Sequence, residues 1–157
     1  MVIKDFITDQ QLNEILNWIS VLDPVKRGID PNFAKIETIP NAPKCLDDIK
    51  NKCLNSNKRI KYIKSEESDF ILDVPPETTV WMHIDGSRKG YKFIRFIILL
   101  QKPDKGGELI FIDQNIKFNI KDCYVLDSTL LHGMTKVEGS KNYLSIVFSY
   151  DVKEEND

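Results

Sequence analysis

Apolar positions recur at helical spacing near the start of the chain. Four apolar side chains lie between residues 12 and 19 at intervals of three and four, the pattern of a helix with one buried face. Thr8 precedes them and Gln11 follows it by three residues, so a hydroxyl and an amide are placed to form a capping box. The sequence therefore predicts a helix over about 9–20, with a short strand before it at 2–6.

The stretch after this helix combines chain-breaking residues with a second helical pattern. Residues 24–44 carry four prolines and one glycine, which favours irregular or edge-like structure. Around 45–55 apolar side chains again gather on one side, so we expect a second helix there.

From about residue 60 onward the pattern changes to that of short β-strands. Turn-forming pairs such as Pro75-Pro76 and Asp85-Gly86 separate them. The expected strands are 69–74, 78–85, 91–100, 107–112, 115–120, 122–127 and 142–150. Short strands at regular spacing indicate a sandwich or jelly roll. We predict one mainly β domain over 1–157, with its core at about 60–150 and N-terminal helices packed on one sheet. A disordered acidic tail is expected at 151–157.

Composition narrows the class of protein. The chain has 157 residues, 41% of them hydrophobic and 29% charged, so it can bury a core. The formal net charge of −2 argues against a dedicated nucleic-acid binder. The three cysteines lack the spacing of a metal site, which fits a reducing compartment. With no long apolar run and no signal pattern at the N-terminus, we expect a cytoplasmic protein without a membrane span.

The only two histidines of the chain occupy places that suit a metal. His83 precedes Asp85 by two residues, and side chains two apart on a strand point to the same face. His132 ends another hydrophobic strand. Two imidazoles and one carboxylate on one side of an ion leave positions open for other ligands, as in the facial triad of non-haem iron(II) oxygenases. Each histidine alone would be an ordinary core residue.

Four segments surround these residues: HID at 83–85, FIRFIILL at 93–100, GGELIFID at 106–113 and CYVLDSTLLHG at 123–133. In their order and spacing they resemble the 2-oxoglutarate- and Fe(II)-dependent dioxygenase superfamily, in its prolyl-hydroxylase-like branch. The resemblance covers residues 69–150 closely and the N-terminal helix loosely. It implies a double-stranded β-helix, a jelly-roll and cupin-like fold. It also implies Fe(II) at His83, Asp85 and His132, with 2-oxoglutarate as co-substrate and ascorbate as an optional further cofactor.

The same resemblance implies a basic anchor for the distal carboxylate of 2-oxoglutarate. Lys141, nine residues past His132, fits that role by position. Its alternative is an ordinary surface lysine in a turn, and Arg95 on an earlier strand is the reserve candidate. Two departures from the family pattern concern this pocket: Leu99 replaces a common tyrosine, and Tyr143 replaces a common serine or threonine.

Three further side chains lie close in sequence to His83 and Asp85. Trp81 is interpreted as a packed core residue in preference to a residue lining the site. Arg88 and Tyr91 flank the loop after the triad, where they could meet substrate.

The implied reaction hydroxylates a C–H bond while 2-oxoglutarate and dioxygen yield succinate and carbon dioxide. The resemblance favours a peptidyl proline or another amino acid as substrate. A nucleic-acid dealkylating dioxygenase is disfavoured, because that branch needs arginines after the distal histidine and none follows His132. A non-catalytic cupin-like binding module is the alternative from another class. The sequence leaves the oligomeric state open.

Overall fold

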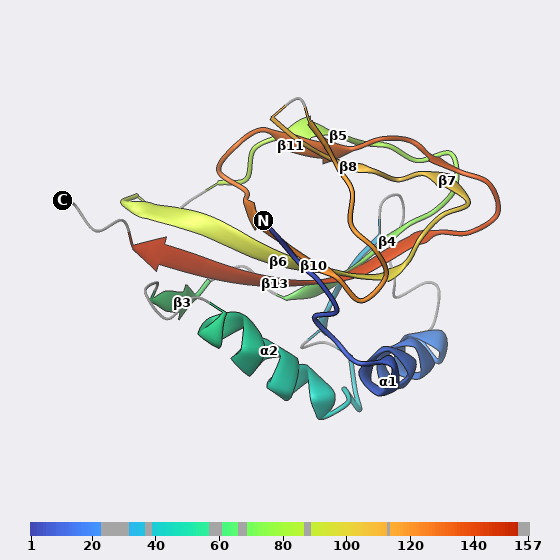
Figure 1. Cartoon of the computed structure of the whole chain (residues 1–157), viewed down its shortest axis with the longest axis horizontal. Helices are drawn as coiled ribbons and strands as arrows, with labels where there is room; N and C mark the ends of the chain where they lie inside the picture. Colours follow the sequence, from blue (N-terminus) through green and yellow to red (C-terminus); the bar gives the residue numbers. More distant parts are fainter. Residues whose placement is uncertain are drawn as a thin grey trace.

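A computed structural model describes residues 1–22, 32–36, 39–56, 61–65, 69–86, 89–112 and 114–153. Two β-sheets face each other, and two helices lie beneath the larger sheet (Figure 1). The first helix, α1 (Asp9–Ser20), begins at the predicted capping box. The Gln11 amide N–H donates to Thr8 Oγ1 at 3.1 Å, and the Thr8 amide N–H donates to Gln11 Oε1 at 2.9 Å. The second helix, α2 (Cys45–Asn55), has the predicted bounds.

In the described part of the chain, seven strands form the larger sheet. Its order is β1-β10-β6-β13-β4-β2, and β3 pairs with one end of β13. All of these pairs are antiparallel. The strands are β1 (Val2–Ile3), β2 (Asn32–Lys35), β3 (Tyr62–Lys64), β4 (Phe70–Val74), β6 (Tyr91–Gln101), β10 (Cys123–Asp127) and β13 (Tyr143–Lys153).

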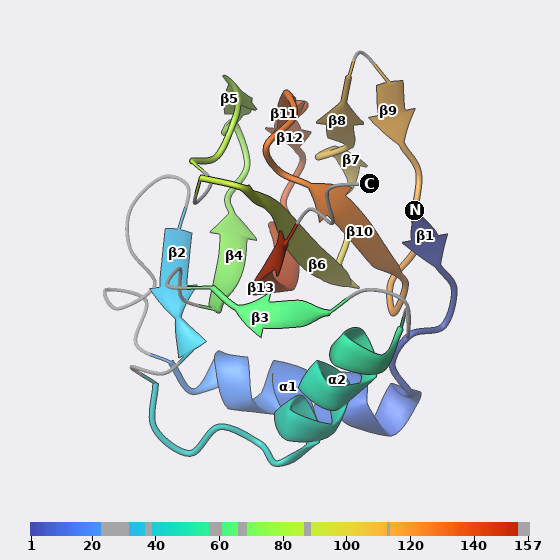
Figure 2. The same cartoon turned by 90° about the vertical axis from the view of Figure 1, so that its left-hand side faces the viewer.

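The smaller sheet runs β5-β11-β8-β9 and lies over the inner face of the larger one (Figure 2). A two-stranded ribbon, β12-β7, continues this layer. The strands are β5 (Val80–His83), β7 (Lys105–Gly106), β8 (Leu109–Phe111), β9 (Gln114–Ile116), β11 (His132–Met134) and β12 (Val137–Glu138). From β4 onward the chain passes back and forth between the two layers, since β4, β6, β10 and β13 lie in the larger sheet and the strands between them lie in the smaller layer. This is the arrangement of the predicted double-stranded β-helix.

Strict alternation along the long strands produces two cores. On β13, Ile146 and Phe148 face the helices and pack with Trp18, Ile49 and their neighbours. The intervening residue Val147 faces the smaller sheet and joins a second core between the two sheets. The helices therefore cover one face of the larger sheet, and its other face is left to line the interior of the β-helix.

The proline-containing stretch 24–44 was expected to be irregular or edge-like, and its described strand β2 is the edge strand of the larger sheet, paired with β4. Two other expectations about local structure were wrong. The acidic tail was placed too early, because β13 continues to Lys153 and Asp151 pairs with both Ile63 and Phe93. The rest of that tail, from 154, lies outside the described residues. Finally, the strand expected at 78–85 ends at His83, so Asp85 lies in a loop.

No helix among the described residues is long and apolar enough to cross a membrane.

Candidate metal centre

Paired strands of the smaller sheet bring the three predicted ligands together. His83 is the last residue of β5 and His132 the first of β11, and the two are direct partners in the antiparallel register. Asp85 follows His83 by two residues, and its amide N–H donates to the Ser128 carbonyl at 2.9 Å. One ligand atom from each of the three residues lies within 4.8 Å of the other two. We call His83, Asp85 and His132 the triad.

Both imidazoles are oriented by a hydrogen bond to the backbone carbonyl two residues earlier in the chain. Nδ1 of His83 lies 2.7 Å from the Trp81 carbonyl oxygen, and Nδ1 of His132 lies 2.8 Å from the Leu130 carbonyl oxygen. Because a carbonyl oxygen only accepts, each Nδ1 must carry the hydrogen. In a neutral ring, Nε2 then has a free lone pair, which is the form that binds a metal.

The Nε2 atoms converge on the carboxylate. Nε2 of His83 lies 3.7 Å from Asp85 Oδ1, and Nε2 of His132 lies 3.5 Å from Asp85 Oδ2. The ring centroids are 4.4 Å apart. Burial lowers the pKa of His132, which favours its neutral form. Asp85 Oδ2 is itself buried, and its partner in the described part of the chain is the guanidinium of Arg95.

This donor set fits a divalent metal ion. Two imidazole nitrogens and one carboxylate oxygen are ligands that suit Fe(II) and similar ions, and a site of three protein ligands leaves room for others. Both Nε2 atoms point at the same carboxylate, while both Nδ1 atoms are occupied by backbone carbonyls. The geometry therefore fits a metal site better than a packed pair of core histidines.

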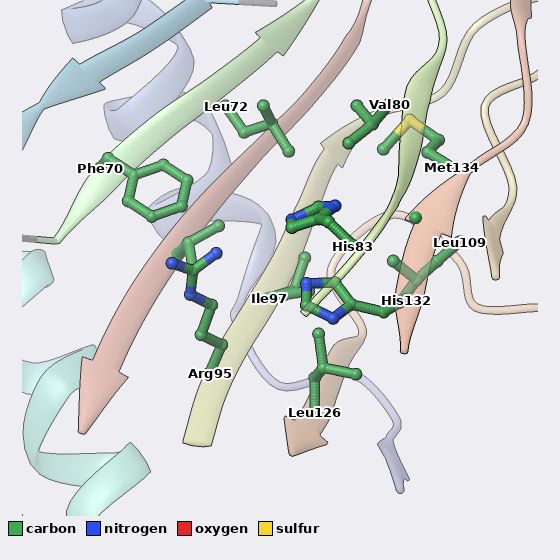
Figure 3. Close-up of a pocket in the computed structure, with 12 residues that line it drawn as sticks. Phe70, Leu72, Val80, His83, Arg95, Ile97, Leu109, Leu126, His132 and Met134 are labelled. Atoms are coloured by element: carbon green, nitrogen blue, oxygen red, sulfur yellow. The ribbon is translucent and has the colours of Figure 1, made fainter. Parts of the chain in front are cut away.

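A cavity between the two sheets opens beside the triad; we call it the central cavity. His83, His132 and Arg95 supply its polar groups, and apolar side chains such as Phe70, Ile97 and Val147 form most of the wall. Figure 3 shows the two imidazole rings side by side, with Arg95 reaching toward the same space from β6. The cavity volume is about 50 Å³, room for only a few water molecules.

Arg95, the reserve candidate for the anchor, lines the central cavity next to Asp85. Nη1 of Arg95 lies 3.0 Å from Asp85 Oδ2, and the Arg95 side chain is only 13% exposed. Strand parity gave a usable signal. Arg95 is a single charged residue in an otherwise apolar part of β6, and it shares the inner face with Ile97 and Leu99.

Lys141 lies outside the lining of the central cavity. It belongs to the turn before β13, its side chain is 64% exposed, and its Nζ lies 3.7 Å from Asp104 Oδ1. Among the described residues that line the central cavity, Arg95 is included and Lys141 is not. An exposed ion pair of this length contributes little, so the position of Lys141 follows from the turn that carries it.

The remaining candidates have mixed outcomes. Trp81 is not a core residue, since 81% of it is exposed. Tyr91 begins β6 and is partly exposed, whereas Arg88 lies outside the described residues. Leu99 and Tyr143, the two departures from the family pattern, both belong to the core between the sheets. The Tyr143 hydroxyl is buried without a hydrogen-bond partner in the described part of the chain.

Exposed apolar side chains lie next to the triad residues, either as neighbours along the chain or on the paired strand β8. Ile84 follows His83, Leu131 precedes His132, and Ile112 follows Phe111, the partner of His132 on β8. The Ile112 amide N–H donates to the Leu131 carbonyl at 3.1 Å, which places these two residues side by side. The edge of the smaller sheet next to the triad is therefore apolar on its exposed side.

In comparisons by sequence, no family model and no curated protein matches this chain. Solved structures do match in shape. A viral collagen prolyl hydroxylase from Paramecium Bursaria Chlorella virus-1, in complex with 2-oxoglutarate, is 18% identical with a TM-score of 0.71, over 98% of this chain and 96% of that one. HygX from Streptomyces hygroscopicus, with nickel and 2-oxoglutarate bound, is 13% identical with a TM-score of 0.70, over 96% and 81%.

A third match is a prolyl hydroxylase from Trichoplax adhaerens in complex with a peptide fragment of hypoxia inducible factor. It is 14% identical with a TM-score of 0.66, over 96% of this chain and 82% of that one. These likenesses confirm the double-stranded β-helix, and they confirm at the level of fold the resemblance to prolyl-hydroxylase-like 2-oxoglutarate oxygenases.

Proposed function

We propose that this protein is an Fe(II)- and 2-oxoglutarate-dependent dioxygenase that hydroxylates a C–H bond of a peptidyl proline or another amino-acid residue. The observation that carries the proposal is the triad, with its ligand atoms within 4.8 Å of one another beside the central cavity. In the balanced reaction, 2-oxoglutarate, dioxygen and the substrate C–H bond give succinate, carbon dioxide and an alcohol.

Each part of the site has a distinct task in this reaction. His83, Asp85 and His132 would hold the ion from one side, and bound iron supplies the dioxygen chemistry that protein side chains lack. The carbonyls of Trp81 and Leu130 fix the two imidazoles, so the ligands are oriented before the ion arrives. The apolar cavity wall limits the water that reaches the reacting atoms.

We assign the co-substrate carboxylate to Arg95 in preference to Lys141. A buried guanidinium in the central cavity can form paired, charge-assisted hydrogen bonds with a carboxylate. Lys141 could serve only if its turn left Asp104 and moved toward the cavity. Measuring 2-oxoglutarate affinity in Arg95→Ala and Lys141→Ala decides between the two. We expect a loss of about tenfold or more for Arg95→Ala and little change for Lys141→Ala.

The substrate class is supported by the surface beside the triad. Trp81, Ile84 and Leu131 are large, apolar and exposed there, and they suit a polypeptide with apolar side chains. The net charge of −2 does not favour a nucleic acid. Two of the structural matches are prolyl hydroxylases, which is why a peptidyl proline is the first substrate to test.

The test is succinate formation from 2-oxoglutarate with Fe(II) and ascorbate, in the presence of proline-rich peptides. We expect succinate from the wild type and none above background from His83→Ala. Lys105→Ala is the matched control, because Lys105 pairs with Glu138 on the exposed ribbon β12-β7. A peptide product heavier by one oxygen atom would identify the substrate. Metal and 2-oxoglutarate binding without any succinate would instead support the non-catalytic binding module.

A further inference from the structure

Arg95 contacts the carboxylate that the triad offers to a metal. Its Nη1 lies 3.0 Å from Asp85 Oδ2, and the two side chains are only 13% and 15% exposed. The same oxygen lies 3.5 Å from Nε2 of His132. The guanidinium thus occupies a position next to the one that a bound ion would take.

Two aromatic rings keep the guanidinium inside the protein. The Cζ atom of Arg95 lies 5.1 Å from the ring centroid of Phe70 and 5.1 Å from that of Phe93. Both rings belong to the larger sheet, whereas Asp85 follows β5 of the smaller one. Because arginine stays protonated in proteins, the cavity contains a fixed positive charge between its two walls.

A fixed positive charge at this place acts in opposite directions on the two ligands. It repels a divalent cation at Asp85 and attracts a dicarboxylate, and partial burial strengthens both effects. Asp85, a divalent ion and a dicarboxylate together leave one excess negative charge, which Arg95 cancels. The charges in the site therefore balance when neither ligand is bound, through the pair of Arg95 and Asp85, and again when both are bound, whereas either ligand alone leaves an excess charge.

We propose that Arg95 makes metal binding and dicarboxylate binding interdependent, a role that rests on the proposed function. In the metal-free protein its guanidinium pairs with Asp85 and weakens binding of the ion. Once the ion is bound to Asp85, the guanidinium turns to the dicarboxylate. The small cavity fits this exchange, since with Arg95 extended toward Asp85 it holds only a few water molecules.

The direct test measures two affinities in the Arg95→Met variant by titration calorimetry without oxygen. The probes are Mn(II), which replaces Fe(II) without turnover, and 2-oxoglutarate. We expect Mn(II) alone to bind the variant about fivefold more tightly than the wild type, within the usual range of coupling between sites. At saturating Mn(II), 2-oxoglutarate should bind about tenfold or more weakly. Lys105→Met removes a surface charge elsewhere and should change neither affinity.

The two affinities are expected to change in opposite directions in Arg95→Met, and this separates the proposed role from a structural one. If Arg95 merely orients Asp85 or supports the fold, Arg95→Met should weaken both ligands, and that result, or an unchanged Mn(II) affinity, would overturn the proposal. If the wild type itself binds no Mn(II), the proposed function fails as a whole. If the wild type binds both ligands but Arg95→Met binds Mn(II) no more tightly than the wild type, only the coupling is refuted.

A second variant tests the same idea without altering Arg95. Asp85→Asn removes the negative charge that holds the guanidinium in the metal-free protein. With a chelator present, 2-oxoglutarate should therefore bind Asp85→Asn about tenfold more tightly than the wild type. If the two proteins bind it equally under these conditions, Arg95 is not held back by Asp85 and the exchange does not occur.

Discussion

Gly133 offers a way to move one metal ligand without replacing it. It follows His132 on β11 and faces β5, the strand that carries His83. A Cβ built at Gly133 would lie 2.8 Å from the Val80 carbonyl oxygen and 2.9 Å from Met82 Sδ. The thioether can rotate away, but the backbone oxygen is about 0.6 Å inside the 3.4 Å at which ordinary contact begins.

The change Gly133→Ala should therefore push β5 away from β11 by about half an ångström. A shift of this size reaches the tolerance of a preorganised site, about 0.5 Å. We expect Mn(II) affinity to fall by about tenfold or more, in the range seen when support of a ligand is lost. Overpacking should also lower the free energy of unfolding by about 1–3 kcal/mol.

Gly86 supplies the matched control for this prediction. It lies one residue after Asp85, and a Cβ there would meet nothing within 4 Å. Gly86→Ala should leave stability unchanged within about 0.5 kcal/mol and Mn(II) affinity unchanged. Calorimetric titration with Mn(II) and thermal unfolding of both variants give the comparison. Wild-type affinity and stability in Gly133→Ala would show that close packing of β5 on β11 does not position the ligands.

Three further predictions concern the scaffold. Thr8→Ala removes the capping box of α1 and should lower the free energy of unfolding by about 1 kcal/mol, measured by denaturant titration. Asp122 is buried, which raises its pKa, but hydrogen bonds from Lys4 and two backbone amides outweigh this and hold the pKa below 3.8. The charged Asp122 thus stabilises the fold above pH 3.8, and this contribution is lost as the pH falls through the lower pKa that Asp122 has in the folded protein. In Asp122→Asn, the free energy of unfolding should therefore decrease less steeply as the pH is lowered in this range. Burial raises the pKa of all three thiols, to about 11 for Cys45, to about 12 for Cys123, and also for Cys53. Alkylation should therefore be slow in the native protein and complete on unfolding, and rapid modification of the native protein would contradict their burial.

The sequence predicted the regular elements well where local signals were strong. The helix at 9–20 has both an apolar face and a capping box, and these two signals agree on where it begins. Prolines around strand β2 left irregular and edge-like structure both open, and pairing with β4 along the sheet edge decides its conformation. The strand tail at 151–153 was missed because its charges resemble a frayed end, although Asp151 is buried by pairing on both sides.

The candidate site was predicted in part. The three triad residues follow from their type and spacing, although strand β5 ends before Asp85. It faces the histidines from a loop held by Ser128, not from a continuous strand. The anchor was the weak point, since spacing after His132 does not reveal that Asp104 pairs with Lys141. The contact between Arg95 and Asp85 joins two sheets, and such a contact depends on the tertiary fold.

The most direct test of the account is a Mn(II) titration of the wild type and of three single variants, His83→Ala, Asp85→Ala and His132→Ala. We predict one ion per wild-type chain, bound by these three side chains. Each variant should lose more than about a hundredfold in affinity while remaining folded by circular dichroism, since each removes a ligand and not merely its support. Wild-type affinity in His132→Ala, or tight binding that survives in all three variants, would place the metal elsewhere and contradict the account.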